Sequence, residues 1–561
     1  MTLATGAPAD ALFLLQDVLG APGQLQSLPA FADADADLWK QVLEEAGKFV
    51  AGAVAPLNAV GDEPGCRFEA GRVITPDGFA QAYREFWQAG WPALACAQDD
   101  GGQGLPWILE GVLYEMLSGA NHGWTMAPGL LHGAYECLKH HGSEDLKQAY
   151  LGKIATGEWL ATMCLTEPQA GSDLGQVRTQ AVPQADGGFR LSGTKIFISG
   201  GEHDLTENIV HLVLAREAGA PAGPKGLSLF LVPKLLPGGV RNGVHCERIE
   251  EKMGLHGSPT CVMRFEQAAG WRVGETGRGL NAMFVMMNAA RLHVALQGIG
   301  LLDAAWQKAH AYAQERTQMR APGKLRGTGE TDPIIRHPAV RRILETERAW
   351  IDGLRLLAYR TGVELDIARH HGDGSCREAA RQWCSLVTPV LKALCTEQGF
   401  LGASRCLQVF GGHGYVKEWG IEQIVRDARV TMLYEGTNEI QAIDLLVRKV
   451  LPDGGAALRS LLAALRAEKS NAQVDALFDA LTVATAELVE RAAVDAVLPY
   501  EAADDYLRAV GLALFAWAWC KIGASPRASG PRWSAPAEAA RLRIVPEFAM
   551  RLSILSTLCQ R

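Results

Sequence analysis

The spacing of apolar residues changes twice along the chain. In the first third they recur every three or four positions, as at Leu38, Val42 and Ala46, which is the repeat of an amphipathic helix. From about Trp159 they alternate in short runs separated by turns, the pattern of strands, and after Gly279 the helical spacing returns. The pattern therefore predicts helices, then a small antiparallel β-domain, then helices again.

These changes divide the chain into five segments. A chain of 561 residues exceeds the size at which one core keeps growing, so several domains are expected. The predicted segments are an N-terminal arm (1–36), a helical domain (37–158), a β-domain (159–278), a second helical domain (279–452) and an additional helical domain (453–561).

Finer features are predicted within these segments. In the arm, Ala11–Leu19 fits a short amphipathic helix that docks onto the rest of the chain. The domain at 37–158 is expected to be all-helical, and strands are expected at Phe189–Gly193, Asn208–Ala215 and Gly226–Pro233. Ser525–Pro536 is rich in Ser, Pro and Gly and is expected to be a loop.

Composition and charge exclude several classes of function. A net charge of −8 gives no broad basic surface for nucleic acid. Twelve cysteines without a C-x-x-C pair predict reduced thiols. No apolar run approaches the roughly 18 residues of a membrane span, and the N-terminus lacks the basic start of a secretory signal. We therefore expect a cytoplasmic protein without membrane contact.

Two sequence blocks near residue 420 combine glycines with one acidic residue. The first is Gln408-Val-Phe-Gly-Gly-His-Gly-Tyr415, and the second is Tyr434-Glu-Gly-Thr-Asn-Glu-Ile-Gln441. Glycines let the main chain approach a flat or anionic cofactor closely, and Glu435 is placed to act as a base. A turn that ends a helix would also be rich in glycine. These two blocks therefore indicate a cofactor site only in combination with a third block.

The third block is Met163-Cys-Leu-Thr-Glu-Pro-Gln-Ala-Gly-Ser-Asp173. In this order the three blocks resemble the acyl-CoA dehydrogenase family of flavoproteins, and the resemblance covers roughly residues 40 to 450. The chain's length, its segment Ile198–Asp204 and its helical tail are most similar to the longer, 3-methylmercaptopropionyl-CoA dehydrogenase-like members, which have an extra C-terminal domain.

The resemblance implies a fold, a reaction and partners. The fold would be a helical domain, a small antiparallel β-barrel and a helical domain like a four-helix bundle, followed by the extra helices. The reaction would be the α,β-dehydrogenation of an acyl-CoA, with 3-methylmercaptopropionyl-CoA or another short or medium chain as substrate. FAD would be the electron sink, and an electron-transferring flavoprotein would accept the electrons. A homodimer or a dimer of dimers would complete the cofactor site.

The resemblance also assigns the catalytic residues. Removing an α-proton from a thioester needs a base, and Glu435 matches that position in the Tyr-Glu-Gly-Thr pattern. Some relatives carry the base before an arginine on another helix, where this chain has Ala290. Arg291 matches the arginine near the acyl-CoA and the base. Asn288 stands where an Asp often serves the CoA, which removes a negative charge.

Cofactor contacts follow from the same resemblance. Cys164, Leu165 and Thr166 match the segment that hydrogen-bonds the flavin ring, and Ser172 matches a pyrophosphate contact. Phe197 and Ser199 stand where relatives have Trp and Thr or Ser against the flavin, although a buried strand position would also accommodate Phe197.

A neighbouring subunit is expected to complete the FAD site. Arg316 resembles the arginine that pairs with the pyrophosphate. Gln408, Gly411 and Gly412 resemble the backbone surface that contacts the adenosine part of FAD. Thr437 and Glu439, which follow Glu435 in the same loop, are expected to approach the cofactor as well. Pro338 stands where relatives often carry Gln, so one cofactor contact is expected to be lost or replaced.

Other functions stay open on the sequence alone. An oxidase relative would pass electrons to oxygen, although its nitroalkane-oxidising branch uses Asp where this chain has Glu435. An alkylation-response relative binds DNA, but residues 456–561 lack a basic cluster. Cys137, His140 and His141 have a spacing that could gather a metal on one helical face; no fourth ligand is evident, so no metal site is predicted.

Overall fold

The computed structural model describes residues 6–561, apart from the side chains of residues 6, 7 and 288. The chain groups into two compact units. The helical unit holds Pro106–Ala120, Arg291–Arg561 and the described part of Met1–Lys48. The mixed unit holds Phe49–Leu105 and Asn121–Ala290. The first five residues of the predicted N-terminal arm lie outside the described residues.

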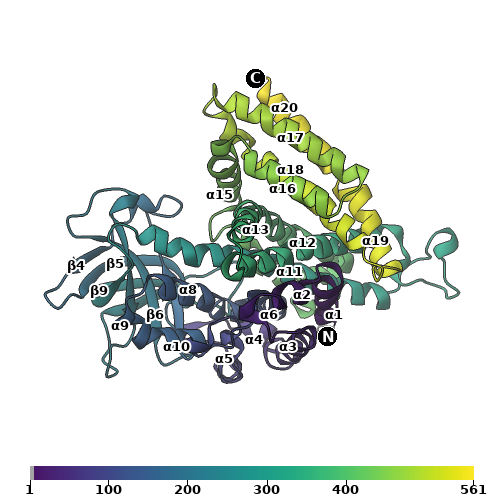
Figure 1. Cartoon of the computed structure of the whole chain (residues 1–561). Helices are drawn as coiled ribbons and strands as arrows, with labels where there is room; N and C mark the ends of the chain where they lie inside the picture. The colour runs from purple at the N-terminus through teal and green to yellow at the C-terminus, as the bar shows by residue number, and fades with distance from the viewer. Residues whose placement is uncertain (1–5) are drawn as a thin grey trace. The chain divides into compact units, whose positions relative to one another are not determined.

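The mixed unit is built around β-strands (Figure 1). Its strands are β1 Arg67–Glu69, β2 Arg72–Ile74, β3 Leu160–Cys164, β4 Gln180–Pro183, β5 Phe189–Ser199, β6 Ile209–Glu217, β7 Leu227–Pro233, β8 Val244–Ile249 and β9 Thr260–Val273. Its helices are α4 Leu57–Asp62, α5 Phe79–Gln88, α7 His122–Thr125, α8 Leu131–His141, α9 Glu144–Leu146 and α10 Gly152–Thr156.

Seven of these strands form one sheet that closes on itself. The order is β3-β6-β4-β5-β9-β7, β8 pairs with β9, and β7 pairs back onto β6. All seven residues of β7 are buried, as expected for a short continuous apolar run inside a sheet. The core of this barrel includes Phe189, Phe230 and Phe265. The predicted small β-domain is therefore a barrel, and the three predicted strands overlap β5, β6 and β7, with Asn208 and Gly226 lying one residue before β6 and β7.

Two details differ from the expectation drawn from the sequence. The segment 37–158 is not all-helical, because β1 and β2 form an antiparallel hairpin within it. Each of these strands has only three residues, too few to show an alternating pattern. The barrel is also not purely antiparallel, since β6 pairs parallel with both β3 and β4.

The helical unit contains most of the α-helices of the described chain. They are α1 Gly6–Leu12, α2 Ala21–Gln26, α6 Trp107–Ala120, α12 Pro338–His370, α13 Gly374–Phe410, α14 Ile421–Ala428, α15 Asn438–Ile443, α16 Ala456–Glu468, α17 Ala472–Ala492, α18 Leu498–Gly523, α19 Pro531–Ala539 and α20 Glu547–Cys559. Two more helices, α3 Ala36–Phe49 and α11 Gly279–Glu315, run across the boundary between the units. Helix α19 begins within the predicted loop Ser525–Pro536, which is therefore shorter than expected.

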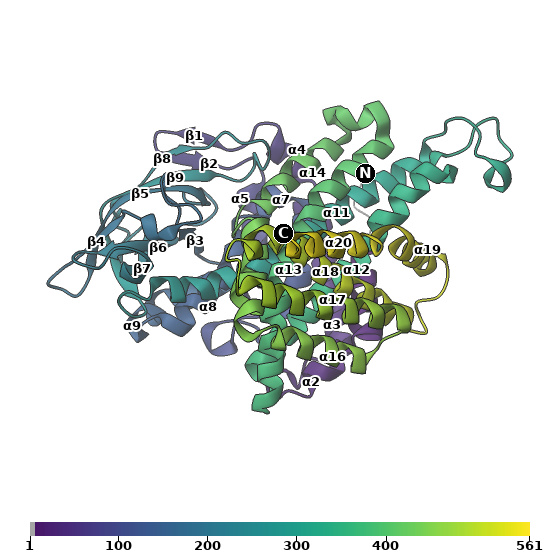
Figure 2. The same ribbon diagram turned by 90° about the horizontal axis from the view of Figure 1, so that it is seen from above.

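The C-terminal helices pack directly on the central pair α12 and α13. Helix α18 contacts α12, α13, α17 and α20, and α19 contacts α12 (Figures 1 and 2). Most of α18 is buried, including Phe515, Trp517 and Tyr506, so it is apolar on nearly every side. These helices consequently share a core with the rest of the helical unit.

Glycines allow α11 to approach two other helices closely. A Cβ atom at Gly298 would collide with the Cys395 carbonyl oxygen of α13. A Cβ atom at Gly119 of α6 would lie 2.7 Å from the carbonyl oxygen of Gly300. The backbones of α6, α11 and α13 therefore meet with no room for a side chain at these crossings.

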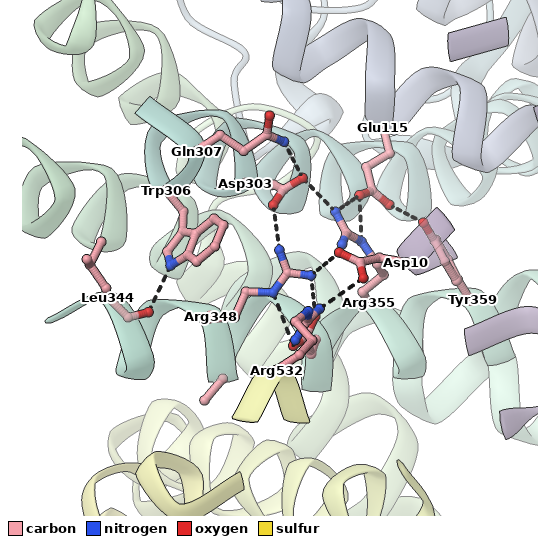
Figure 3. Close-up of polar contacts among 12 residues, drawn as sticks. Asp10, Glu115, Asp303, Trp306, Gln307, Leu344, Arg348, Arg355, Tyr359 and Arg532 are labelled. Atoms are coloured by element: carbon pink, nitrogen blue, oxygen red, sulfur yellow. Dashed lines mark hydrogen bonds and ion pairs between the residues drawn. The ribbon is translucent and has the colours of Figure 1, made fainter. Parts of the chain in front are cut away.

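A buried network of charges joins five helices of the helical unit (Figure 3). Arg355 of α12 donates to Glu115 Oε1 of α6 at 2.8 and 2.5 Å and to Asp303 Oδ2 of α11 at 3.1 Å. Arg348 of α12 donates to the other Asp303 oxygen at 3.2 Å and to Asp10 of α1 at 2.5 Å. The network thus fastens the N-terminal arm to the central helices through Asp10, which directly precedes the segment Ala11–Leu19 predicted to dock. Leu14 and Leu15 of that segment are fully buried.

The C-terminal helices join the same network through one residue. Arg532 of α19 donates to both oxygens of Asp352, at 2.7 and 2.9 Å, and lies 3.2 Å from an Asp10 oxygen. Asp352 also accepts from Arg348 at 2.8 Å. Buried charges are tolerated only when paired in this way, so the network specifies how the two ends of the chain pack.

One described helix, α11, is long and apolar enough to cross a membrane. However, 82% of its most apolar stretch is buried within the protein. This burial is typical of a core helix.

Candidate active site

Glu435 lies in a tight turn of the helical unit, directly before α15. Its backbone φ is +56°, a left-handed conformation that a residue with a side chain rarely adopts. Gly436 follows with φ +85°, and Thr437 caps α15 by accepting a hydrogen bond from the Ile440 N–H at 3.4 Å. Such strain persists where surrounding contacts enforce it, and it is concentrated at functional sites.

Side-chain hydrogen bonds hold the turn in this conformation. The buried Gln441 donates from Nε2 to the carbonyl oxygens of Glu435 at 3.2 Å and Gly436 at 3.4 Å. The Tyr434 hydroxyl donates to Gln297 Oε1 of α11 at 2.5 Å. Neither Gln297 nor Gln441 was assigned a role from the sequence, although Gln441 ends one of the quoted blocks.

The Glu435 side chain has cationic neighbours but no direct partner. Among the described residues, neither its carboxyl nor its backbone N–H makes a hydrogen bond. Burial raises the pKa of its carboxyl to about 7, against the opposing effect of Arg291 and Lys392. A carboxyl in this range can take up a proton near neutral pH, and its unpaired N–H can donate to a ligand oxygen.

Arg291 lies beside this turn, as predicted from the sequence. It is buried in α11. If Gly436 carried a Cβ atom, that atom would lie 3.9 Å from Arg291 Nη2, so the guanidinium adjoins the turn. Its Nη1 is 3.8 Å from Asp444 Oδ2, in the π-helical segment Asp444–Val450 that follows α15. Arg291 and Glu435 are therefore brought together within the helical unit.

Lys392 is a further cation near Glu435 that sequence reasoning missed. It is fully buried in α13, and its Nζ donates to Asn438 Oδ1 of α15 at 3.0 Å. A lysine 43 positions before the base in a long helix carries no local signal. Only the packing of α13 against α15 brings it to the turn.

In the mixed unit, the segment predicted to contact the flavin ring follows β3. Cys164 is buried at the end of the strand, whereas Leu165 and Thr166 are partly exposed. The buried Lys195 donates to the Leu165 carbonyl and to Glu167 Oε1, both at 2.9 Å, and the Ile196 N–H donates to the Thr166 carbonyl at 2.9 Å. Burial raises the pKa of the Glu167 carboxyl, but the Lys195 ammonium and the hydrogen bonds to Glu167 outweigh this effect and lower that pKa to about 2. A buried ion pair thus fixes this segment.

Phe197 is exposed rather than part of the barrel core. It sits at an irregularity of β5, between Lys195 and Ile198, with φ +59° and a relative exposure of 60%. A buried strand position is therefore the wrong interpretation of Phe197. A large ring held outward in a strained conformation offers an apolar plane, which suits one face of a flavin.

The polar residues predicted to bind FAD in this unit are available to a ligand. Within the described part of the chain, the hydroxyls of Thr166, Ser172 and Ser199 have no hydrogen-bond partner. Ser172 is exposed, and the other two are partly exposed. An apolar plane with free hydroxyls fits a flavin and its phosphates, so the residues present are compatible with FAD.

The residues predicted to complete a second subunit's FAD site lie in the helical unit. Arg316 is exposed just beyond α11, and its guanidinium has no acidic partner among the described residues. Gln408 lies in the last turn of α13, which ends at Phe410. Gly411 and Gly412 follow, and a Cβ at either glycine would meet open space. These positions can approach a ligand, as the prediction requires.

The remaining predicted positions are less informative. Thr437 caps α15, and its hydroxyl lowers the pKa of the exposed Glu439 by a hydrogen bond. Pro338 is the first residue of α12, where a missing N–H has no cost. The Asn288 side chain lies outside the described residues.

Three protein-family models match the chain in the order of its segments. They are "Acyl-CoA dehydrogenase, N-terminal domain" over residues 39–158, "Acyl-CoA dehydrogenase, middle domain" over 162–268 and "Acyl-CoA dehydrogenase, C-terminal domain" over 277–450. Together they cover both the predicted flavin segment and the turn with Glu435.

Two curated relatives match most of the chain. The 3-methylmercaptopropionyl-CoA dehydrogenase of Ruegeria pomeroyi is 43% identical over 498 residues, 87% of this chain and 84% of that protein. The broad-specificity linear acyl-CoA dehydrogenase FadE5 of Mycobacterium tuberculosis is 38% identical over 467 residues, 80% of this chain and 76% of that protein.

Two solved structures share the fold over nearly the whole length. Caenorhabditis elegans ACDH-11 in complex with C11-CoA has a TM-score of 0.74 at 20% identity and covers 93% of this chain and 88% of that one. An acyl-CoA dehydrogenase of Bacillus anthracis complexed with FAD has a TM-score of 0.73 at 21% identity, with 92% and 88% covered.

Proposed function

The chain belongs to the acyl-CoA dehydrogenase family of FAD-dependent oxidoreductases, and we propose that it oxidises a short or medium acyl-CoA with Glu435 as the base. The observation that carries this proposal is the turn at Glu435. There a carboxyl that has no hydrogen-bond partner among the described residues lies beside Arg291, and burial raises its pKa to about 7.

Glu435 would remove the α-proton of the thioester. A base is most effective when its pKa lies near the working pH, because it is then both ionised and basic enough. The Glu435 N–H would donate to the thioester oxygen as negative charge develops there. Gln441 assists indirectly, since it holds the Glu435 carbonyl in the following peptide and thereby limits movement of the turn.

Arg291 would keep the ionised base accessible. Its positive charge lowers the pKa of Glu435, which opposes the effect of burial. Because Arg291 is itself 3.8 Å from Asp444, its position is fixed before a substrate binds. We infer that it positions Glu435 and the acyl thioester together.

FAD, when bound, supplies the two-electron sink for the β-hydrogen. In the mixed unit the hydroxyls of Thr166, Ser172 and Ser199 and the ring of Phe197 would hold it, with backbone contacts at Cys164 and Leu165. Arg316 and the surface of Gln408, Gly411 and Gly412 would hold the FAD of a second subunit. This makes a homodimer the minimum assembly in the proposal.

The substrate we propose is 3-methylmercaptopropionyl-CoA or another slim acyl chain of similar length. The 43% identity to the Ruegeria pomeroyi enzyme supports it, whereas the FadE5 relative acts on linear acyl-CoAs more broadly. We further propose that electrons leave to an electron-transferring flavoprotein and that the protein is cytoplasmic.

Anaerobic bleaching of the yellow holoprotein by a panel of acyl-CoAs tests the proposal. The panel should contain 3-methylmercaptopropionyl-CoA, butyryl-CoA, octanoyl-CoA and palmitoyl-CoA. Rapid bleaching by the thioether and butyryl substrates, and slow bleaching by palmitoyl-CoA, is the expected result. Failure of every acyl-CoA to bleach the flavin would contradict the proposal.

A substitution distinguishes the base from the rest of the site. Glu435→Gln is expected to slow bleaching by roughly 10²- to 10⁴-fold, the usual contribution of a positioned base, while FAD stays bound. Glu490→Gln, at an exposed position of α17, is the matched control and should bleach as the parent does. Equal rates in all three proteins would remove Glu435 from the mechanism.

A further inference from the structure

Lys392 lies in the interior of the helical unit without a carboxylate partner. Its relative exposure is 0%, and it contacts no acidic group at ion-pair distance among the described residues. A buried ammonium is costly unless something nearby stabilises it. Burial lowers its pKa to about 7, whereas Glu435 and Glu439 raise it from a greater distance.

Among the described residues, the Lys392 ammonium contacts one polar side chain, and it lies just after the turn that carries Glu435. Asn438 is the first residue of α15, three positions after Glu435, and its Oδ1 accepts from Lys392 Nζ at 3.0 Å. The same oxygen accepts from the Thr396 hydroxyl at 3.2 Å, and Asn438 Nδ2 donates to the Ala393 carbonyl at 3.1 Å. Three bonds therefore fasten the start of α15 to one turn of α13.

The charges around Glu435 come from several elements. Arg291 approaches from α11, Lys392 from α13 and Glu439 from α15, and the phenol of Tyr434, close to Asp427, is adjacent in the chain. Arg291 is partly neutralised by Asp444, which also lies 3.0 Å from Lys449. Lys392 is the cation of this group that is held by a neutral side chain.

We propose that Lys392 is a positioning residue for the base: through Asn438 it anchors the turn that carries Glu435, and its ammonium adds to the positive charge of Arg291 that favours the ionised form of Glu435. This inference rests on the proposed function of Glu435. It predicts two separable effects of Lys392, one on the geometry of the turn and one on the charge of the base.

The sign of the charge effect is fixed. A cation near a carboxyl favours the ionised form, so removing it raises the pKa of that carboxyl. Loss of the Lys392 ammonium should therefore move the titration of Glu435 to higher pH. Loss of the anchoring bond alone should loosen the turn without this shift.

Three variants of the FAD-loaded protein separate the effects. Lys392→Met removes both charge and bond, Lys392→Arg restores the charge, and Thr396→Val removes a neutral member of the same cluster. The readouts are the pH dependence of flavin bleaching by the best acyl-CoA and the infrared carbonyl band of protonated Glu435, identified by its loss in Glu435→Gln. The infrared titration needs no substrate.

We expect Lys392→Met to raise the midpoint of both titrations by about one pH unit and to slow bleaching at pH 7 about fivefold, since the ionised fraction of the base would fall there from about one-half to about one-tenth. Lys392→Arg should bring the midpoint back towards the parent, and Thr396→Val should leave it unshifted. Flavin content and the unfolding temperature show whether each variant is folded.

The outcomes divide cleanly. If the folded Lys392→Met protein titrates at the parent's midpoint in the infrared, Lys392 does not set the charge of the base and the inference is wrong. The same holds if Thr396→Val shifts the midpoint as much as Lys392→Met does. If the parent itself is bleached by no acyl-CoA, the proposed function fails instead, and the infrared result still reports on Lys392.

Discussion

Asp303 and Glu435 are two carboxyl groups of the helical unit with two cations each in their surroundings, yet their pKa values shift in opposite directions. Asp303 is buried but contacts Arg355 at 3.1 Å and Arg348 at 3.2 Å, and these partners lower its pKa. Glu435 has Arg291 and Lys392 nearby without a hydrogen bond to either, and burial raises its pKa to about 7.

Direct hydrogen bonds, more than the number of nearby charges, therefore decide whether a buried carboxyl stays ionised. Bonded cations stabilise the charged form strongly at short range, whereas distant ones only moderate the cost of burial. The Asp303 network consequently suits a structural role. The looser surroundings of Glu435 suit a group that must gain and lose a proton.

The largest effect should come from breaking the structural network at Arg355. Arg355→Met leaves Glu115 without its cation and Asp303 with one fewer, in a buried site. Removing one partner of such a pair destabilises proteins by about 3–5 kcal/mol. Denaturant unfolding at pH 8 measures the change in the free energy of unfolding.

The matched control for this variant is Arg381→Met. Arg381 pairs with Glu378 on the exposed side of α13, at 3.2 Å, and such surface pairs contribute about 0–1 kcal/mol. A loss in Arg355→Met no greater than in Arg381→Met would mean that the network is not a stabilising element.

An intermediate effect is expected in the pH dependence of stability at Glu435. Because its pKa is raised from 4.5 to about 7 in the folded protein, the folded state binds a proton that the unfolded chain has released. The stabilisation from this group is therefore present below pH 4.5 and is lost as pH rises through about 7. Glu435→Gln removes the titration. As pH rises across this window, the free energy of unfolding of the variant should therefore increase relative to that of the parent by up to about 1.4 kcal/mol per pH unit.

Parallel unfolding curves for parent and Glu435→Gln at pH 5, 6 and 7 test this expectation. A constant difference between the two proteins would show that Glu435 titrates near its ordinary pKa. Asp303 should behave in the opposite way, because its lowered pKa makes its stabilisation disappear only as the solution becomes acidic.

The smallest effect is expected at the edge of the network. Arg532 joins α19 to Asp352 by two bonds but is about one-third exposed, and Arg348 still pairs Asp352 when it is removed. Arg532→Met should therefore cost about 1 kcal/mol, less than Arg355→Met. Limited proteolysis should cut first near α19 if this contact holds the C-terminal helices, and an unchanged cleavage pattern would argue against that role.

Much of the fold could be predicted because its elements are long and periodic. The helical spacing before and after the β-domain and the apolar run of β7 are local signals that tertiary packing reinforces. The hairpin of β1 and β2 could not be predicted, since three residues in each strand are too few for a pattern. The parallel pairing of β6 depends on distant segments, which spacing alone does not encode.

The candidate site shows the same division. Glu435 and Thr166 lie in the sequence blocks Tyr434–Gln441 and Met163–Asp173, and Arg291 matches a single position of the family pattern. All three could therefore be predicted from the sequence. Lys392 could not, because it reaches the turn only through the packing of α13 on α15. The exposed, strained conformation of Phe197 is likewise a property of the barrel's irregular pairing at β5.

The most direct test is the rate of anaerobic flavin reduction by a saturating acyl-CoA, measured between pH 5 and 9 in the parent and in Glu435→Gln. We expect the parent's rate to rise with pH to a plateau with a midpoint near 7, and the variant to lack this rise and to be slower by roughly 10²- to 10⁴-fold on the plateau. A midpoint near 4.5, or a variant as fast as the parent, would contradict this expectation.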